Sequence, residues 1–147
     1  MSRFTTSSVF PDINVWLALS SPDHEHFAKA WRWYNSLDRA EVLCFCRITQ
    51  LGLLRLLTTQ PVMGLGTLTQ TEAWNAYDRW LSDASAEFLE EPVGMDIIFR
   101  SRTQSPQVSP KEWADAYLAA FAESAHLTLV TFDKALAGKA KGSVLLT

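Results

Sequence analysis

Short apolar runs alternate along the chain with longer stretches in which apolar residues recur every three or four positions. The short runs fit buried strands, and the longer stretches fit helices with one apolar face. Strands are predicted at residues 7–12, 42–46, 86–89, 127–131 and 143–146. Helices are predicted at residues 13–20, 22–37, 47–58, 69–83, 94–102, 110–125 and 133–139. This alternation predicts a mainly parallel sheet in a three-layer α/β/α sandwich.

Two helix starts carry recognisable capping residues. Ser109 can cap a helix whose first turn accepts Pro110, and Glu112 completes a capping box. The run Ser21-Pro22-Asp23 predicts a similar start for the second helix. The Gly-x-Gly at residues 64–66 indicates a turn, because neither a helix start nor a Lys-Ser/Thr pair follows it as in a phosphate loop.

Composition narrows the class of protein. A chain of 147 residues with 48% hydrophobic and 20% charged residues is expected to fold as one domain, residues 1–147. No apolar run approaches the ~20 residues that span a bilayer, and Met1–Thr6 lacks the apolar core of a signal peptide, so a cytoplasmic protein without membrane contact is expected. The net charge of −3 gives no general attraction to nucleic acid. A polyanionic substrate would therefore need local arginines and a metal ion.

The two cysteines, Cys44 and Cys46, alternate within a predicted strand and so share one face. Buried structural thiols are expected, because two residues this close on one strand cannot form an unstrained disulfide and two ligands do not make a zinc site.

Three aspartates stand where an α/β domain places chemistry. Asp12 and Asp133 each follow a predicted strand, where each can act as a catalytic acid or only as a helix N-cap. Asp115 lies in line with Leu118 and Ala119 on an apolar helical face, so its carboxylate is expected to be buried away from bulk water.

Acids brought to one edge of a sheet would repel, and a divalent cation is the usual means of keeping them ionised. Hard carboxylate oxygens favour Mg²⁺, with Mn²⁺ as a possible substitute, over Zn²⁺. His24 and His26 are two positions apart in a predicted helix, where their side chains diverge, so they are interpreted as an exposed first turn and not as metal ligands.

The run from Phe10 to Leu19, with Asp12-Ile13-Asn14, resembles the Asp-x-Asn opening of the PIN-domain nucleases, especially the VapC toxins. The segment from Ile48 to Arg55 resembles the second motif of that family. The segments from Trp113 to Ala120 and from Leu129 to Asp133 resemble the third and fourth motifs, in the same order and over nearly the whole chain.

The resemblance implies a PIN fold and a Mg²⁺-dependent endoribonuclease, the toxin of a type II toxin–antitoxin pair. Asp12, Asp115 and Asp133 match the metal ligands, and Asn14 and Thr131 match polar residues that orient the acids or a water on the metal. Mg²⁺ would polarise an RNA phosphodiester and activate water, leaving a 5′-phosphate and a 3′-hydroxyl. The implied partners are a VapB-like antitoxin, the RNA substrate and a second copy of the chain in a homodimer.

The second motif departs from the family, because Gly52 stands where members commonly carry glutamate. Three carboxylates with additional waters are hypothesised to suffice, although Glu90, Glu91 or Asp96 could supply a fourth acid and activity could also be weakened. Arg55 occupies a frequent arginine position of the family and is a candidate phosphate contact.

Two alternatives stay open at this level. One is a degenerate, non-catalytic PIN-like module that binds a protein or RNA, with Gly52 as the sign of decay. The other is a haloacid-dehalogenase-like phosphotransferase, which is disfavoured because Asn14 stands where that class places its second aspartate.

Overall fold

The computed structural model describes residues 8–147, so the prediction that Ser7 begins the first strand lies outside the described part. The strands are β1 (Ser8–Pro11), β2 (Val42–Phe45), β3 (Glu87–Phe88), β4 (Thr128–Thr131) and β5 (Val144–Leu145). The longer helices are α1 (Ile13–Ser20), α2 (Phe27–Asn35), α3 (Arg47–Leu57), α5 (Gln70–Asp83), α6 (Met95–Arg102) and α7 (Glu112–Ala125). The short ones are α4 (Gln60–Met63), the 3₁₀-helix η1 (Gly64–Gly66) and α8 (Lys134–Ala137).

All five strands pair in parallel, in the order β3-β2-β1-β4-β5. The chain builds outward from β1 to β3 and then returns to the other side of β1 to add β4 and β5. The direction of winding therefore reverses between β1 and β4, where Phe10 pairs with Leu129 and Pro11 with Val130. Ligands of open parallel sheets bind beyond the carboxyl ends of the strands at such a switch point.

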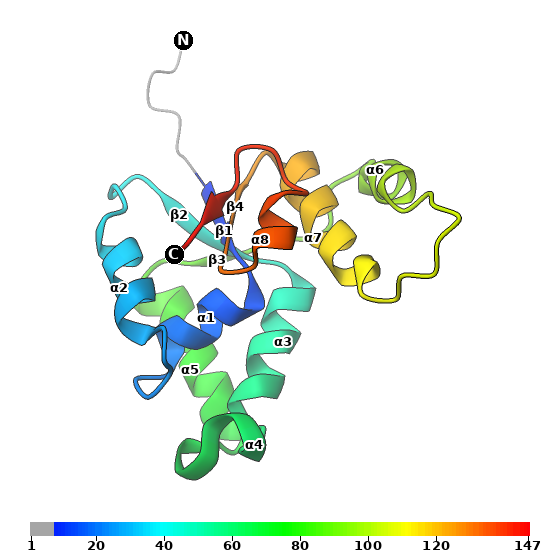
Figure 1. Ribbon diagram of the computed structural model, residues 1–147. Helices are drawn as coiled ribbons and strands as arrows, with labels where there is room; N and C mark the ends of the chain where they lie inside the picture. The colour runs from blue at the N-terminus through cyan, green and yellow to red at the C-terminus, as the bar shows by residue number, and fades with distance from the viewer. Residues whose placement is uncertain (1–7) are drawn as a thin grey trace.

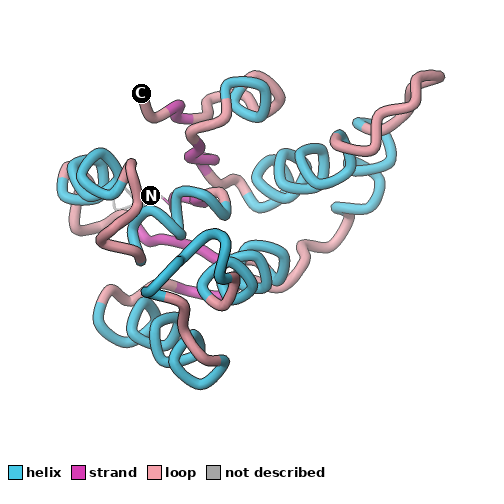
Figure 2. Tube along the Cα trace, turned by 60° about the horizontal axis from the view of Figure 1, so that its bottom comes forward, coloured by secondary structure: helices cyan, strands magenta, loops and turns pink. Residues whose placement is uncertain are grey.

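Alternating side chains of the strands supply two hydrophobic cores, one on each face of the sheet. Val9 and Val130 belong to the core under α1, α2, α3 and α5, whereas Phe10 and Leu129 belong to the core under α6, α7 and α8. Figure 1 shows these two groups of helices on opposite sides of the strands, and the turned view in Figure 2 shows the strands in the middle with helices around them. The predicted three-layer α/β/α sandwich is confirmed.

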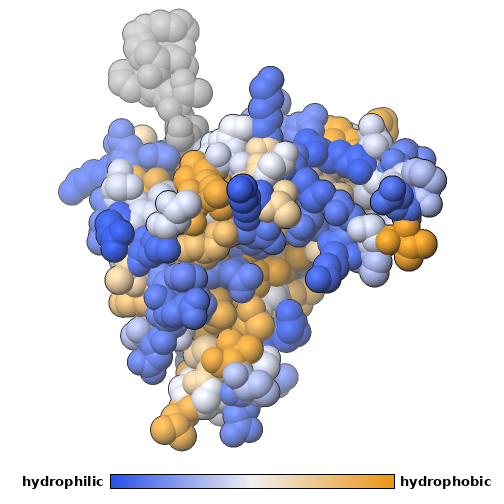
Figure 3. All heavy atoms as spheres, viewed as in Figure 1, coloured by the Kyte–Doolittle hydropathy of each residue, from blue (hydrophilic) through white to orange (hydrophobic). Residues whose placement is uncertain are grey.

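The helix pair α3 and α5 extends beyond the sheet to a tip formed by α4 and η1 (Figure 1). Within this tip, residues 64–66 were predicted as a turn, whereas helix α4 was not predicted. The tip carries Val62 and Leu65 exposed to solvent, and Figure 3 shows hydrophobic surface extending from the middle of this face towards the tip.

Both helix starts predicted from capping residues were wrong. Helix α2 begins at Phe27, because His24 N–H donates to the Ser21 carbonyl and Phe27 N–H to the His24 carbonyl, two turn bonds that replace a first helical turn. Helix α7 begins at Glu112 with Lys111 as a cap that makes no side-chain bond, and the Glu112 carboxylate pairs with Lys139 instead of closing a capping box.

Cys44 and Cys46 are free, buried and in the same core, as predicted. Across residues 8–147, none of the helices combines the length and apolar character needed to cross a membrane.

Candidate active site

Asp12 lies at the carboxyl end of β1, beside β4, and begins α1. Its backbone N–H donates to the Val130 carbonyl at 2.8 Å, which ties the end of β1 to β4. Its Oδ1 accepts from the Ile13 N–H at 2.6 Å, so the N-cap role is real. The residue is nevertheless only 8% exposed, which is unusual for a carboxylate whose sole purpose is capping.

The hydroxyl of Thr131 connects two of the acids. Thr131 Oγ donates to Asp12 Oδ2 at 2.9 Å and accepts from the Asp133 N–H at 2.9 Å. Asp133 caps α8 by accepting from the N–H groups of Ala135 and Leu136. Because Thr131 is fully buried at the end of β4, this chain of hydrogen bonds fixes the orientation of the Asp12 carboxylate and the path of the backbone into Asp133.

Asp115 lies in the first turn of α7 and faces the strand-end acids. It is half-buried, so the expectation that its carboxylate is fully shielded from water was wrong. The reason is its place near the open end of the helix, one turn before the fully buried Ala119 and Ala120. The pKa of Asp115 is raised, first by desolvation and then by the charge of Asp133, while Lys139 acts in the opposite direction.

The acids lie close enough for the charges of Asp115 and Asp133 to disfavour ionisation of Asp12, and for the charge of Asp133 to disfavour ionisation of Asp115. The pKa of Asp12 is raised chiefly by burial and further by the charges of Asp115 and Asp133, against the hydrogen bonds from Thr131 and Ile13 that lower it. Within the described residues, however, no set of three acidic, histidine or cysteine side chains is already arranged to hold a metal ion. The donor set fits a hard divalent cation chemically, and its charge would offset this repulsion.

The raised pKa of Asp12 gives a stability prediction for the metal-free protein. When the pKa of an acid is higher in the folded than in the unfolded chain, the free energy of unfolding falls as the pH rises from the unfolded-state pKa to the folded-state pKa. Ionised Asp12 therefore destabilises the fold at pH 7. Asp12→Asn is expected to raise the melting temperature in EDTA by about 2–4 °C, the shift that about 1 kcal/mol produces in a domain of this size. Thermal melts from pH 4 to 8 measure it.

The exposed Asp78 on α5 provides the matched control, since Asp78→Asn removes one charge far from the cluster. We expect excess Mg²⁺ to stabilise the parent and the Asp78→Asn protein but to have little effect on Asp12→Asn. An Asp12→Asn protein that melts below the parent at neutral pH in EDTA would contradict the electrostatic argument.

A groove of about 690 Å³ opens in front of the strand-end acids. Asp12, Asn14 and Asp133 line one part of it, and Asn14 is exposed there, so that its orienting role stays a prediction. The remaining wall was missed in the sequence, because it combines residues of α1, α3 and α4 with the turn before α2 and the residue between Thr131 and Asp133. It consists of Leu17, Asp23, His24, Glu25, His26, Leu56, Val62 and Phe132.

Gly52 is buried in α3 because α1 packs directly on its backbone. A Cβ built at this position would lie 2.7 Å from Cγ1 and 2.9 Å from Cγ2 of Ile13, closer than real atoms approach, and its nearest contact would be Cδ1 of the same side chain. Ile13 therefore fills the space in which a longer residue at position 52 would begin. No sequence pattern signals this pairing, since the two residues are 39 positions apart.

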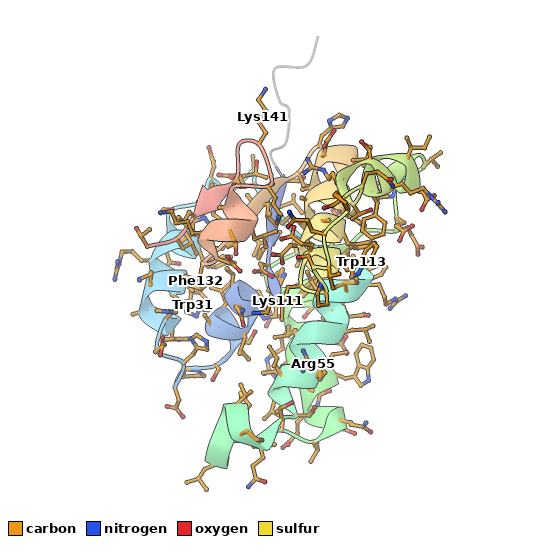
Figure 4. The ribbon with its side chains drawn as sticks, turned by 45° about the vertical axis from the view of Figure 1, so that its right-hand side comes forward. Trp31, Arg55, Lys111, Trp113, Phe132 and Lys141 are labelled. Atoms are coloured by element: carbon orange, nitrogen blue, oxygen red, sulfur yellow. The ribbon has the colours of Figure 1, made fainter. Side chains whose placement is uncertain are left out.

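Of the three other acids considered for the site, two have partners of their own, and Glu90 lines a separate groove. Glu91 accepts from the Tyr117 hydroxyl at 2.7 Å, and Asp96 pairs with Arg100 one turn along α6. Arg55 is exposed on α3, where Figure 4 labels it, and lines a separate groove beside Trp74. Its phosphate contact stays a prediction.

The parallel sheet, its switch point and the acids at that point define a class of protein. The PIN domain family matches residues 9–142 of the chain, nearly its full length. This chain belongs to the PIN domain family, and the phosphotransferase alternative is set aside.

Similar proteins indicate which part of the PIN domain family this chain resembles. It is 41% identical to Ribonuclease VapC41 of Mycobacterium tuberculosis over 128 residues, which is 84% of this chain and 88% of that protein. Solved structures share the fold at lower identity. VapBC2 from Rickettsia felis, bound to a promoter DNA fragment, superposes with a TM-score of 0.66 at 13% identity, covering 94% of this chain and 96% of that one. VapC20 of Mycobacterium tuberculosis, a sarcin-ricin loop cleaving toxin, superposes with a TM-score of 0.61 at 16% identity, covering 88% and 93%.

Proposed function

We propose that Asp12, Asp115 and Asp133 hold a catalytic Mg²⁺, for which Mn²⁺ can substitute, and that the chain uses it to cut RNA. The chain is a VapC-family PIN ribonuclease, the toxin component of a VapBC toxin–antitoxin system, as its homology to Ribonuclease VapC41 indicates. The observation that carries the site assignment is the Thr131 hydroxyl, which orders Asp12 and the start of Asp133 at the switch point of the sheet.

The reaction is hydrolysis of a phosphodiester, in which water attacks phosphorus in line with the leaving oxygen. A bound Mg²⁺ supplies Lewis-acid polarisation of the phosphate and activation of water at neutral pH. Water oxygen bonds to phosphorus as the bond to the 3′-oxygen breaks, and that oxygen takes up a proton, so a 5′-phosphate and a 3′-hydroxyl result. Thr131 holds the Asp12 carboxylate in place, and Asn14 adds a polar side chain to the same groove, where it would orient the acids or the attacking water.

The absence of a fourth carboxylate at position 52 is part of this proposal. Ile13 occupies that space, and Glu91 and Asp96 have other partners. Mg²⁺ commonly binds through a few protein carboxylates and keeps several waters. Three acids therefore form a sufficient site, and Gly52 marks a repacked contact between α1 and α3 and not a decayed enzyme.

The proposed partner is an antitoxin protein of the VapB kind. VapBC2 from Rickettsia felis was solved as a complex of this type on DNA. An acidic groove with exposed apolar residues at one end, including Val62, suits a basic or aromatic antitoxin segment. A homodimer and a cytoplasmic location, both implied by the sequence, belong to the same proposal.

The proposed activity is tested on total cellular RNA with the purified protein in Mg²⁺, in Mn²⁺, in EDTA, and in EDTA followed by excess Mg²⁺. We expect discrete cuts with both metals, no cuts in EDTA, recovery on adding Mg²⁺, and 5′-phosphates at the new ends by sequencing. Equal cleavage in EDTA would overturn the metal assignment. A folded protein that cuts no RNA from several sources would favour the non-catalytic binding module.

A further inference from the structure

Two aromatic rings meet at the end of the groove nearest Asp133. The imidazole of His26 stacks on the ring of Phe132, with centroids 4.8 Å apart and planes inclined by 29°. Phe132 lies in the chain between Thr131 and Asp133, and Figure 4 labels it beside α1, below α8. The stack therefore adjoins the proposed catalytic acids directly.

Both rings are held before any ligand arrives. Phe132 is partly buried and packs against the core under α1 and α2. The backbone N–H of His26 donates to Nδ1 of His24 at 3.0 Å, which fixes the turn that carries both histidines. Phe132 thus backs one face of the His26 ring, and the Nε2 at the edge of that ring lies 3.2 Å from a carboxylate oxygen of Glu25. The His26 side chain is 36% exposed and forms part of the groove wall.

The charge around these rings limits what can bind there. Asp23 and Glu25 join Asp12 and Asp133 in the groove wall, and the wall includes neither lysine nor arginine among the described residues. A phosphate would be repelled at this end unless a metal ion held it. The ring of a nucleobase carries no charge, so the acidic groove would not repel it in this way.

We infer that the open face of His26, backed by Phe132, stacks a nucleobase next to the cut in an unpaired RNA strand. Nucleobases stack on aromatic and histidine side chains in single-strand recognition, and one such contact contributes about 1–3 kcal/mol. A base inside a duplex has its faces covered, so this contact selects unpaired RNA. The inference rests on the proposed function and adds the substrate class and a subsite to it.

The test uses binding, so that it does not depend on cleavage. In an Asp115→Asn background with Mg²⁺, fluorescence anisotropy measures the affinity for a short unpaired oligoribonucleotide and for its duplex. His26→Ala is expected to weaken binding of the unpaired strand about tenfold, which corresponds to about 1.4 kcal/mol. His26→Phe, which keeps a flat ring, is expected to stay within about twofold of the background protein.

A matched control is His126→Asn at the end of α7, where φ is 58° and asparagine is tolerated. It is expected to leave the affinity unchanged. The same oligoribonucleotides are then made with abasic nucleotides placed one at a time. At one position beside the cut, the loss caused by His26→Ala should disappear, because the stacking partner is already gone.

Several outcomes would overturn the inference. They are an unchanged affinity in His26→Ala, equal losses in His26→Ala and His26→Phe, an effect of the same size on the duplex, and no RNA binding by the background protein. If RNA binding depends on His26 as expected while the parent shows no metal-dependent cleavage, the proposed catalytic function fails and the base subsite stands.

Discussion

Asp115→Asn is expected to lower the rate of RNA cleavage at least about 100-fold, a loss of about 2.7 kcal/mol of transition-state stabilisation. The substitution removes the charge that Asp115 would give to the metal ion and keeps the shape of the side chain. Asp115 is half-buried and none of the core residues depends on its charge, so the fold should persist. Single-turnover cleavage of a labelled RNA in saturating Mg²⁺ measures the effect.

The same helix supplies a control for this variant. Glu123 is exposed further along α7 and pairs with Arg102, away from the acids. Glu123→Gln should leave the cleavage rate within about twofold of the parent, since a surface ion pair contributes about 1 kcal/mol or less to stability. Parent-like cleavage by a folded Asp115→Asn protein would remove Asp115 from the catalytic site.

Gly52→Ala is expected to destabilise the protein by about 1–3 kcal/mol, the usual range for overpacking a core. Helix propensity alone predicts the opposite, because alanine is better than glycine within a helix by about 1 kcal/mol. The added methyl group would collide with Ile13, which already covers the glycine. Urea denaturation of both proteins gives the difference in the free energy of unfolding.

The sign of this effect should reverse once the collision is removed. In an Ile13→Ala background, Gly52→Ala is expected to stabilise by up to about 1 kcal/mol, because only the propensity difference remains. In that background Gly52→Glu also has room to extend a fourth carboxylate, which should tighten Mn²⁺ binding. If Gly52→Ala stabilises the parent chain, Ile13 does not close this position.

The sandwich could be predicted from the sequence because neighbouring residues of a strand alternate between its two cores. Val9 and Phe10 are adjacent in a strand and must enter opposite cores, and Leu129 and Val130 do the same in β4. Asp12 and Asp133 could be singled out because each ends one of these strands. The strand order, which makes them neighbours, depends on crossovers that the local pattern does not record.

The errors arose where side chains compete with the backbone or with distant segments. His24 bonds to the backbone of His26 and delays α2, and Glu112 turns towards Lys139 instead of capping α7. The same turn carries His26 to Phe132, which is 106 positions away in the chain, so interpreting the two histidines as an exposed helical turn missed their place in the groove. The burial of Asp115 was overestimated because helical periodicity gives a residue's face but not how far the start of the helix extends beyond the core.

The most direct test of the three-acid site is anomalous diffraction from a crystal of the protein containing Mn²⁺. A three-acid site requires one or more peaks within bonding distance of oxygens from Asp12, Asp115 and Asp133, with waters completing the coordination. A peak bound by a fourth protein carboxylate, or peaks that do not touch Asp12, would contradict it.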